Sequence, residues 1–323
     1  MTGAAFPDRI VQVTVSVTRP NAQAGGAVQT STYVWQQNRM RVTLRQGGAQ
    51  FGNARVEVFG VPPLDMNNIA RLWLETLTPQ ITDTIQIAVW NGQSFTPLFQ
   101  GVIAWSAVDA SAMPQVRLVI EANSSFALGL TTASPYANAG PVTLQAALTT
   151  IAAAASFTVV YSANATQHQL TDVRLTGSPL DQIIALMHHY PDLTWTTQQQ
   201  QVIVRPALAP VTQAGTIPSA GSNTGVGANV TPTPIRIAVD TGMQSSPVYS
   251  TSGLQIATLF NPQITPGTTL DVETTFDYVN RTIWVANVLE HQLDVNMPNG
   301  QWTTYVAANS FGTKGNNNGN TSS

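Results

Sequence analysis

A residue pattern that occurs twice constrains the fold of this chain more than any other feature of its sequence. Residues 69–124 and 256–311 each begin with Ile-Ala-x-Leu and continue through an alternating apolar run, a Met-Pro turn and an Ala-Asn-Ser ending. Further anchors are Pro79 and Pro262, Met113 and Met297, and Ala122 and Ala308. Because the separation of these anchors drifts only from 183 to 186 residues, we expect a duplicated β unit. Chance recurrence of common strand residues is the alternative, and it predicts two halves with unrelated topology.

Residues 1–125 have the pattern of an antiparallel β domain with one short helix. Alternating apolar and polar residues predict strands over 9–18, 32–35, 41–44, 54–59, 84–90, 97–108 and 115–122. The second and third strands would form a hairpin around Gln-Gln-Asn-Arg. Asp65 is a suitable N-cap for a helix whose apolar face would carry Ile69, Leu72, Trp73 and Thr76. We expect a small closed barrel, because closure removes exposed sheet edges.

Residues 126–210 have a different pattern, typical of a small α+β region. Thr143 is placed to cap one helix, and Ser178-Pro179-Leu180-Asp181 resembles a capping box that starts another. A hairpin is expected around the glutamines between Thr196 and Gln201. Residues 211–234 have the Gly/Ser/Thr composition of a linker. The second β-barrel domain would span 235–313, and the Asn/Gly-rich tail 314–323 is expected to be disordered.

The content of charged residues is low and limits how this chain can act. Only 9% of the 323 residues are charged, against about 25% in an average soluble protein, so we expect partners to cover much of the surface. The twelve arginines form no run and Lys314 is the only lysine, which argues against binding of nucleic acid by surface charge. Cysteine is absent, so disulfides and thiolate metal sites are excluded. No secretory signal and no apolar segment long enough for a membrane helix is expected.

The search for chemistry gives structural interpretations. His188 and His189 would lie at a helix C-terminus, where imidazolium suits the dipole; a zinc site with Asp192 is the alternative. His291 and Glu290 could form a catalytic pair, but neighbouring strand residues point to opposite faces. No nucleophile-elbow, His-Glu-x-x-His or P-loop motif occurs. We therefore expect no enzymatic activity, no cofactor and no metal site.

One acidic pattern could act through its charge. Over residues 270–277, apolar residues alternate with Asp271, Glu273 and Asp277, which would place these carboxylates on one face of a strand. A solvated outer face is the simpler interpretation. The alternative is that this face lines a channel, where negative charge would keep DNA from adhering as it passes.

Three stretches, with the duplication, resemble the baseplate hub proteins of tailed bacteriophages. They are the helix G-S-P-L-D-Q-I-I-A-L-M, the strands L-T-W and V-I-V-R-P after it, and the closing I-W-V-A-N-V-L-E-H-Q-L-D-V-N-M-P-N-G-Q-W-T-T-Y-V. The resemblance implies a mainly β (α+β) chain with two tail-tube-like antiparallel β-barrels. It departs at residues 196–201, where the pattern has a tight Gly or Asn turn.

The same resemblance implies a function in the virion. Three copies would form a homotrimer that matches the hexameric tail tube to the trimeric central spike, with a tube ring above, the spike below and other baseplate proteins around. DNA would pass through without specific binding. The chain would be made in the host cytoplasm, and wall digestion would belong to another protein.

Two other classes remain as alternatives. A secreted or surface β-rich protein that binds or depolymerises carbohydrate would stack sugars on Trp90, Trp105, Trp284 or Trp302, although these lie in strand patterns typical of cores and interfaces. An outer-membrane barrel would need continuous lipid-facing strands, which the two helices and the linker argue against.

Overall fold

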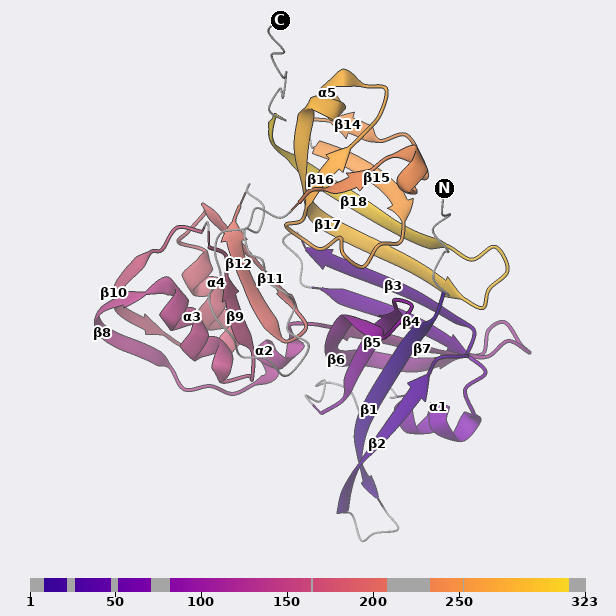
Figure 1. Ribbon diagram of the computed structural model, residues 1–323. Helices are drawn as coiled ribbons and strands as arrows, with labels where there is room; N and C mark the ends of the chain where they lie inside the picture. Colours follow the sequence, from indigo (N-terminus) through magenta and orange to yellow (C-terminus); the bar gives the residue numbers. More distant parts are fainter. Residues whose placement is uncertain are drawn as a thin grey trace, which may run out of the picture.

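One large antiparallel sheet dominates the fold (Figure 1). The computed structural model describes residues 9–21, 27–47, 52–70, 82–163, 165–207, 233–251 and 253–313. Thirteen strands join this sheet, and its main path runs β14-β15-β18-β17-β3-β4-β7-β6-β5-β1-β2, with β16 and β13 attached beside β17. The expected mainly β fold is confirmed.

The first unit supplies seven strands of this sheet and one helix. The strands are β1 (Val11–Asn21), β2 (Ala27–Trp35), β3 (Met40–Gly47), β4 (Asn53–Phe59), β5 (Thr84–Trp90), β6 (Phe95–Asp109) and β7 (Arg117–Asn123). Helix α1 (Pro63–Ile69) begins two residues earlier than the expected cap Asp65, because Pro63 supplies a helical φ at the first position. Ile69 is buried as expected, whereas Leu72, Trp73 and Thr76 lie outside the described residues.

The expected hairpin between the second and third strands is wrong. β2 pairs only with β1, from Val13 opposite Trp35 outwards, while β3 pairs with β4 on one edge and with β17 on the other. The expected barrel is consequently not closed. Closure would require β2 to pair with β3, and β17 from the second unit already occupies that edge of β3.

The second unit has the same strand order with six strands instead of seven. Its elements are β13 (Ile235–Ile237), η3 (Val239–Thr241), β14 (Val248–Ser250), β15 (Gly253–Leu259), β16 (Thr269–Val272), α5 (Asp277–Arg281), β17 (Thr282–Val295) and β18 (Trp302–Thr313). The path β3-β4-β7-β6-β5 of the first unit corresponds to β14-β15-β18-β17-β16, with antiparallel pairing throughout. The next strands differ, since β1 is antiparallel to β5 but β13 is parallel to β16.

A β-bulge that both units contain shows which residues of the two units are equivalent. β6 skips Ala104, between Ile103 opposite Ala122 and Trp105 opposite Glu121. β17 skips Asn287, between Ala286 opposite Ala308 and Val288 opposite Ala307. Bulges re-aim a strand and break its pairing, so two at one position are a specific likeness. The anchors Ala122 and Ala308 are therefore equivalent, and the turns at Met113 and Met297 join equivalent strands.

One anchor of the repeat is wrong. Ile69 ends helix α1, whereas Ile256 lies in β15, whose counterpart is β4. The equivalent of Ile256 is Val56. Val56 lies two residues after the strand partner of Ala122, and Ile256 lies two residues after the strand partner of Ala308. The helices cause the mismatch, because α1 precedes β5 whereas α5 follows β16. Pro79 lies outside the described residues.

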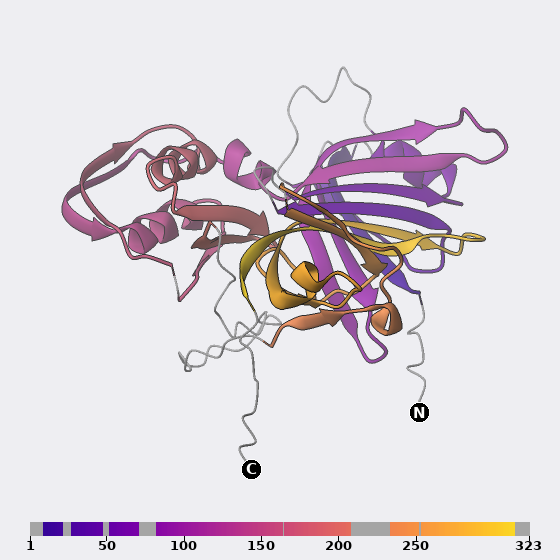
Figure 2. The same ribbon diagram turned by 90° about the horizontal axis from the view of Figure 1, so that it is seen from above.

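The middle region folds around its own apolar cluster. It contains α2 (Phe126–Leu130), β8 (Tyr136–Thr143), α3 (Leu144–Ala153), β9 (Thr158–Tyr161), β10 (Gln169–Leu175), α4 (Pro179–Met187), β11 (Leu193–Gln198) and β12 (Gln201–Pro206). Thr143 caps α3 through Ala146 N at 3.2 Å, and Ser178 and Asp181 form the expected capping box. In Figure 2 this region lies to one side of the large sheet.

The glutamine hairpin forms without the usual turn residues. β11 and β12 pair up to Gln198 opposite Gln201, so Gln199 and Gln200 make a two-residue turn with φ values of 48° and 58°. Positive φ at both positions is the turn geometry that favours Asn-Gly. The Gln199 side chain donates to Pro97 O at 2.6 Å, which ties this turn to β6.

Three apolar clusters hold these parts together. The first-unit cluster also contains Leu293, Val295 and Trp302 from the second unit. The middle region and the second unit each have a further cluster. The second unit thus completes its neighbour's core as well as its sheet.

Candidate functional site

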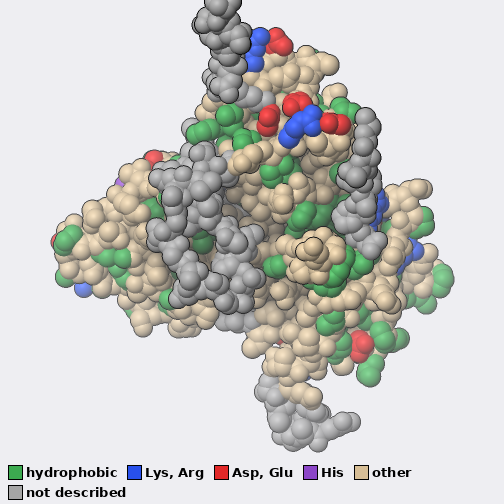
Figure 3. All heavy atoms as spheres, in the orientation of Figure 1, with side chains coloured by type: hydrophobic (Ala, Val, Ile, Leu, Met, Phe, Trp, Pro, Cys, Tyr) green, Lys and Arg blue, Asp and Glu red, His purple; other side chains and the backbone are tan. Residues whose placement is uncertain are grey.

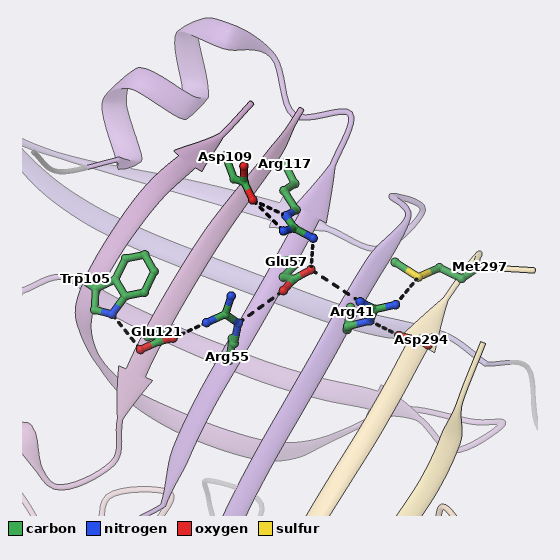
Figure 4. Close-up of polar contacts among 9 residues, drawn as sticks. All are labelled: Arg41, Arg55, Glu57, Trp105, Asp109, Arg117, Glu121, Asp294 and Met297. Carbon is green, nitrogen blue, oxygen red and sulfur yellow. Dashed lines mark hydrogen bonds and ion pairs between the residues drawn. The ribbon is translucent and has the colours of Figure 1, made fainter. Parts of the chain in front are cut away.

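Charged side chains collect on one face of the large sheet, opposite the core of the first unit. This charged face, drawn in Figure 4, comprises outward-pointing residues of β6, β7, β4, β3 and β17. Its members are Trp105, Asp109, Arg117, Glu121, Arg55, Glu57, Arg41 and Asp294. They alternate with buried residues such as Val56 and Leu118, so the period-2 geometry of the strands places all of them on one side.

Glu57 lies at the centre of the charged face and is 7% exposed. Its Oε2 accepts from Arg117 Nη1 at 3.0 Å and lies 4.0 Å from Arg41 Nη1, while its Oε1 accepts from Arg55 Nε at 3.4 Å. Three guanidinium groups from three strands therefore neutralise one carboxylate. The pairing connects β3, β4 and β7 on the side of the sheet away from the core.

The network ends on the β6 side at two points. Asp109 Oδ2 accepts from Arg117 Nε at 2.9 Å and Nη2 at 2.7 Å. Hydrogen bonds from Ser111, and then from Arg117, hold the pKa of Asp109 well below its usual range. The bond to Asp109 in turn raises the pKa of Arg117.

The second β6 end carries an aromatic ring. Arg55 Nη1 donates to Glu121 Oε1 at 2.7 Å, and Trp105 Nε1 donates to Glu121 Oε2 at 2.8 Å. Trp105 is 37% exposed, so its ring remains accessible on this face.

On the opposite side, the network crosses from the first unit to the second. Arg41 Nε donates to Asp294 Oδ1 at 3.0 Å, and Arg41 Nη2 contacts Met297 Sδ at 3.9 Å. Asp294 also accepts from the backbone N–H of Gln301 at 3.1 Å. The charged face therefore spans the β3–β17 junction.

The charge balance of this face determines what it can do. Three arginines face four carboxylates, Glu57, Asp109, Glu121 and Asp294, which gives a formal charge of −1. Guanidinium groups engaged by carboxylates are poor phosphate ligands, because binding a phosphate would break existing pairs. A charged polymer could pass such a surface without being retained.

The sheet continues beyond the charged face with few charges. A groove of about 350 Å³ lies there over β17, β18 and β15. The outward residues along it include Arg45, Val288, Glu290, Tyr305, Ala307 and Gln255. Figure 3 shows another face of the molecule. Most of that visible surface is uncharged, and several charged side chains gather on the second unit.

The predicted acidic strand is divided between strand β16, helix α5 and the segment that joins them. Asp271 lies on β16, whose strand ends at Val272, and Asp277 is the first residue of α5. Glu273 receives a two-point contact from Arg236, at 2.9 Å to Oε1 and 2.6 Å to Oε2. Arg281 pairs with Asp277 at 3.1 Å. The single strand face is wrong; whether these carboxylates line a channel stays a prediction.

The histidines have structural surroundings. His188 caps the C-terminus of α4. His291 is buried, its Nδ1 lies 2.9 Å from Thr304 Oγ1, and desolvation lowers its pKa to about 4. Glu290 lies on the other face and accepts from Gln292 at 2.7 Å. Within the described residues, no group of three His, Asp or Glu side chains could hold a metal ion.

One polar pair was not predicted from the sequence. His168 Nε2 lies 2.9 Å from Asp192 Oδ2, and the His168 ring packs 4.3 Å from the Tyr190 ring. The two partners are 24 residues apart, on the residue before β10 and in the turn between α4 and β11, so no local motif indicates the pair.

The tryptophans considered for sugar stacking do not gather on one surface. Trp284 is fully buried and Trp302 is 9% exposed, so both belong to the interior. Trp90 packs against Phe95 with ring centroids 5.1 Å apart. Of the described helices, none combines the length and apolar character needed to cross a membrane.

Comparison with known proteins identifies the fold. Neither a family model nor a curated protein sequence matches this chain. An E. coli component of the type VI secretion system, described as similar to the T4 bacteriophage tail proteins gp27 and gp5, superposes with a TM-score of 0.53 at 8% identity, over 85% of this chain and 74% of that chain.

Two tail proteins give similar values. The 43 kDa tail protein of prophage MuSo2 from Shewanella oneidensis has a TM-score of 0.52 at 8% identity, over 92% of this chain and 97% of that chain. The tail protein from Neisseria meningitidis MC58 has a TM-score of 0.53 at 9% identity, over 92% and 96%. The chain therefore has the fold of phage tail proteins, as the sequence resemblance led us to expect.

Proposed function

We propose that this protein is a structural component of a phage tail, the baseplate hub, and that it acts as a homotrimer. The observation that carries this proposal is the repetition of one strand order in two units that merge into a single sheet. Three such chains present six similar units, so a three-fold ring can meet a six-fold tube on one side and a three-fold spike on the other. The fold shared with solved tail proteins supports the same role.

The charged face is the proposed wall of the DNA path. Its arginines are occupied by Glu57 and its neighbours, so the surface combines polarity with low net charge and weak attraction for phosphate. Assigning the wall to this face replaces the single acidic strand as the main candidate. Asp271, Glu273 and Asp277 remain secondary candidates.

The remaining surface is proposed to contact other tail proteins. A tube ring would bind one rim of the trimer, the spike the other, and further baseplate proteins the periphery. This arrangement accounts for the 9% charged residues, because obligate interfaces are large and poor in charge. We also propose that the chain divides into domains 1–125, 126–210 and 235–313, each contributing most of one apolar cluster, with 211–234 as a linker and 314–323 as a tail.

Native mass measurement of the full chain tests the proposal. We expect a species of three times 34.4 kDa, which should bind a tube or spike protein of the same phage in a stable complex. A monomer that ignores both proteins and binds glycans instead would refute it in favour of the carbohydrate-binding alternative.

A further inference from the structure

The edge of β17 is filled along two successive segments. β16 pairs with its first part, Ile283 to Val285, and β3 pairs with its second part, Val288 to Val295. Thus one long strand receives a neighbour from its own unit and then, beyond the bulge, a neighbour from the other unit.

The equivalent edge of β6 is filled along only one segment. β5 pairs with β6 as far as Val102, and Ile103 N donates to Asp83 O at 2.8 Å. Beyond the bulge, no strand among the described residues pairs with this edge of Trp105–Asp109. This open segment corresponds to the part of β17 that binds β3.

The strand equivalent to β3 is also open. Leu44 of β3 lies opposite Ala54, and Tyr249 of β14 lies opposite Leu254, the counterpart of Ala54. β14 pairs with β15 on one edge, and its other edge has no strand partner in the described part of the chain. The two open edges, on β6 and β14, therefore correspond to the two strands that pair in the β17–β3 junction.

Exposure of the inward side chains agrees with a missing neighbour. At the filled junction, His291 is 1% exposed and Leu44 is 0% exposed. Their equivalents at the open edges, Val108 and Tyr249, are 39% and 50% exposed. Val108 also lines an open, mainly apolar groove of about 590 Å³ beside α1. Apolar side chains exposed next to unpaired strand edges mark sites of association.

The two open edges do not pair with each other within one chain. Six strands lie between β14 and β6 in the sheet, which separates them by roughly 30 Å at the usual spacing between strands. The partner that fits both edges is a second copy of the chain. Because the edges differ, the association is head-to-tail, the type that closes into rings.

We propose that β6 of one copy pairs with β14 of the next, in the register that β17 and β3 use within the chain. In that register, Glu290, His291 and Gln292 lie opposite Arg45, Leu44 and Thr43. Transferred to the open edges, it places Ala107 opposite Ser250, Val108 opposite Tyr249, and Asp109 opposite Val248. This inference rests on the homotrimer proposed above and names the strands that join its subunits.

The charges at the open edges are compatible with this contact. Ala107, Ser250 and Val248 carry no charge, and the Asp109 carboxylate is already bound by Arg117 in its own chain. No like charges would face each other across the new pair. The added pairs would involve all three residues of β14 and give it a strand neighbour on its second edge.

Disulfide trapping tests the register directly, since the chain contains no cysteine. Ala107→Cys combined with Ser250→Cys places one thiol on each edge, directly opposite across two copies. Facing residues of antiparallel strands have Cα atoms about 4.5 to 5.5 Å apart, within disulfide range. We expect oxidation to give a covalent ring of three chains that reducing agent dissolves.

The matched control shifts the register by one residue. Ala107→Cys combined with Tyr249→Cys puts the two side chains on opposite faces of the sheet, so no cross-link is expected. Equal cross-linking of both pairs would overturn the register. A trimer seen by mass in which the designed pair stays reduced would overturn the strand pairing while the proposed function stands.

A charge at the open edge gives a second measurement. Val108→Lys should prevent self-association, because charged side chains block edge pairing, whereas Val108→Thr should retain it. Both variants should keep the urea midpoint of the monomeric wild-type chain, since Val108 is partly exposed. Normal trimers of a folded Val108→Lys variant would contradict the proposal. A wild-type chain that never trimerises, even with tube or spike protein, would refute the homotrimer itself.

Discussion

The two β units share a topology but differ in what each needs from the other. The first unit supplies seven strands around a large core and carries most of the charged face. The second unit has a smaller cluster, short strands β13, β14 and β16, and buries Leu293, Val295 and Trp302 in the core of the first. One strand order can therefore form the larger part of a core in one unit and, in the other, the attachment that completes it. The two units also differ at equivalent strand edges. β17 and β3 pair with each other, whereas their counterparts β6 and β14 have no strand partner there among the described residues.

Truncating the filled junction should have the largest effect. Leu44→Ala removes a fully buried side chain between the two units, so we expect it to lower the free energy of unfolding by about 2 to 5 kcal/mol. Tyr249→Ala, the equivalent change at the open edge, should cost at most about 1 kcal/mol in the monomer, because the ring is half exposed. Urea unfolding of both variants measures this, and equal losses would show that the edges are not different environments.

A change in pH should distinguish His291 from its counterpart Val108. Burial lowers the pKa of His291 from 6.5 to about 4, so between those values the unfolded chain binds more protons than the folded one. Stability contributed above pH 6.5 is therefore lost as pH falls towards 4, by at most about 1.4 kcal/mol per pH unit. His291→Val should flatten this dependence in urea midpoints recorded across the window. An unchanged slope would assign the pH response to other groups.

The charged face should contribute less than the junction. Glu57→Gln keeps the side-chain volume but leaves three arginines without their shared carboxylate, and we expect a loss of about 2 kcal/mol. Glu121→Gln is the matched control at a less buried position, 35% exposed, and should cost at most about 1 kcal/mol. High salt should reduce the difference between the two variants. If Glu121→Gln proves the more costly, Glu57 is not the centre of the network.

Local patterns predicted the elements well, because alternation and caps act over a few residues. β5 spans the expected residues, and the caps at Thr143 and Ser178 form as anticipated. The acidic strand was extended too far because its alternation continues past Val272. There, Asn280 closes a turn instead, with two hydrogen bonds of 2.6 Å to the backbone of Thr274.

Pairings between distant segments could not be predicted in this way. Arg41 and Asp294 are separated by 253 residues, and the charged face depends on contacts of this kind. The expected closed barrel failed for the same reason, since nothing near β3 in the sequence indicates that β17 takes its edge. The turn at Gln199 and Gln200 is a third example of a contact between distant segments. It lacks the usual Asn-Gly residues, and the Gln199 side chain is held by a hydrogen bond to Pro97 O.

The β3–β17 junction also bears on synthesis. A ribosome adding about 5 to 20 residues per second needs roughly 10 to 50 s between these two strands. Throughout that interval, β3 is a strand whose eventual neighbour does not yet exist, and it resembles the edge to which a neighbouring copy would add. Nascent chains on one messenger are therefore exposed to premature exchange of strands, and chaperones that shield this half until translation ends should raise the yield of correctly assembled protein.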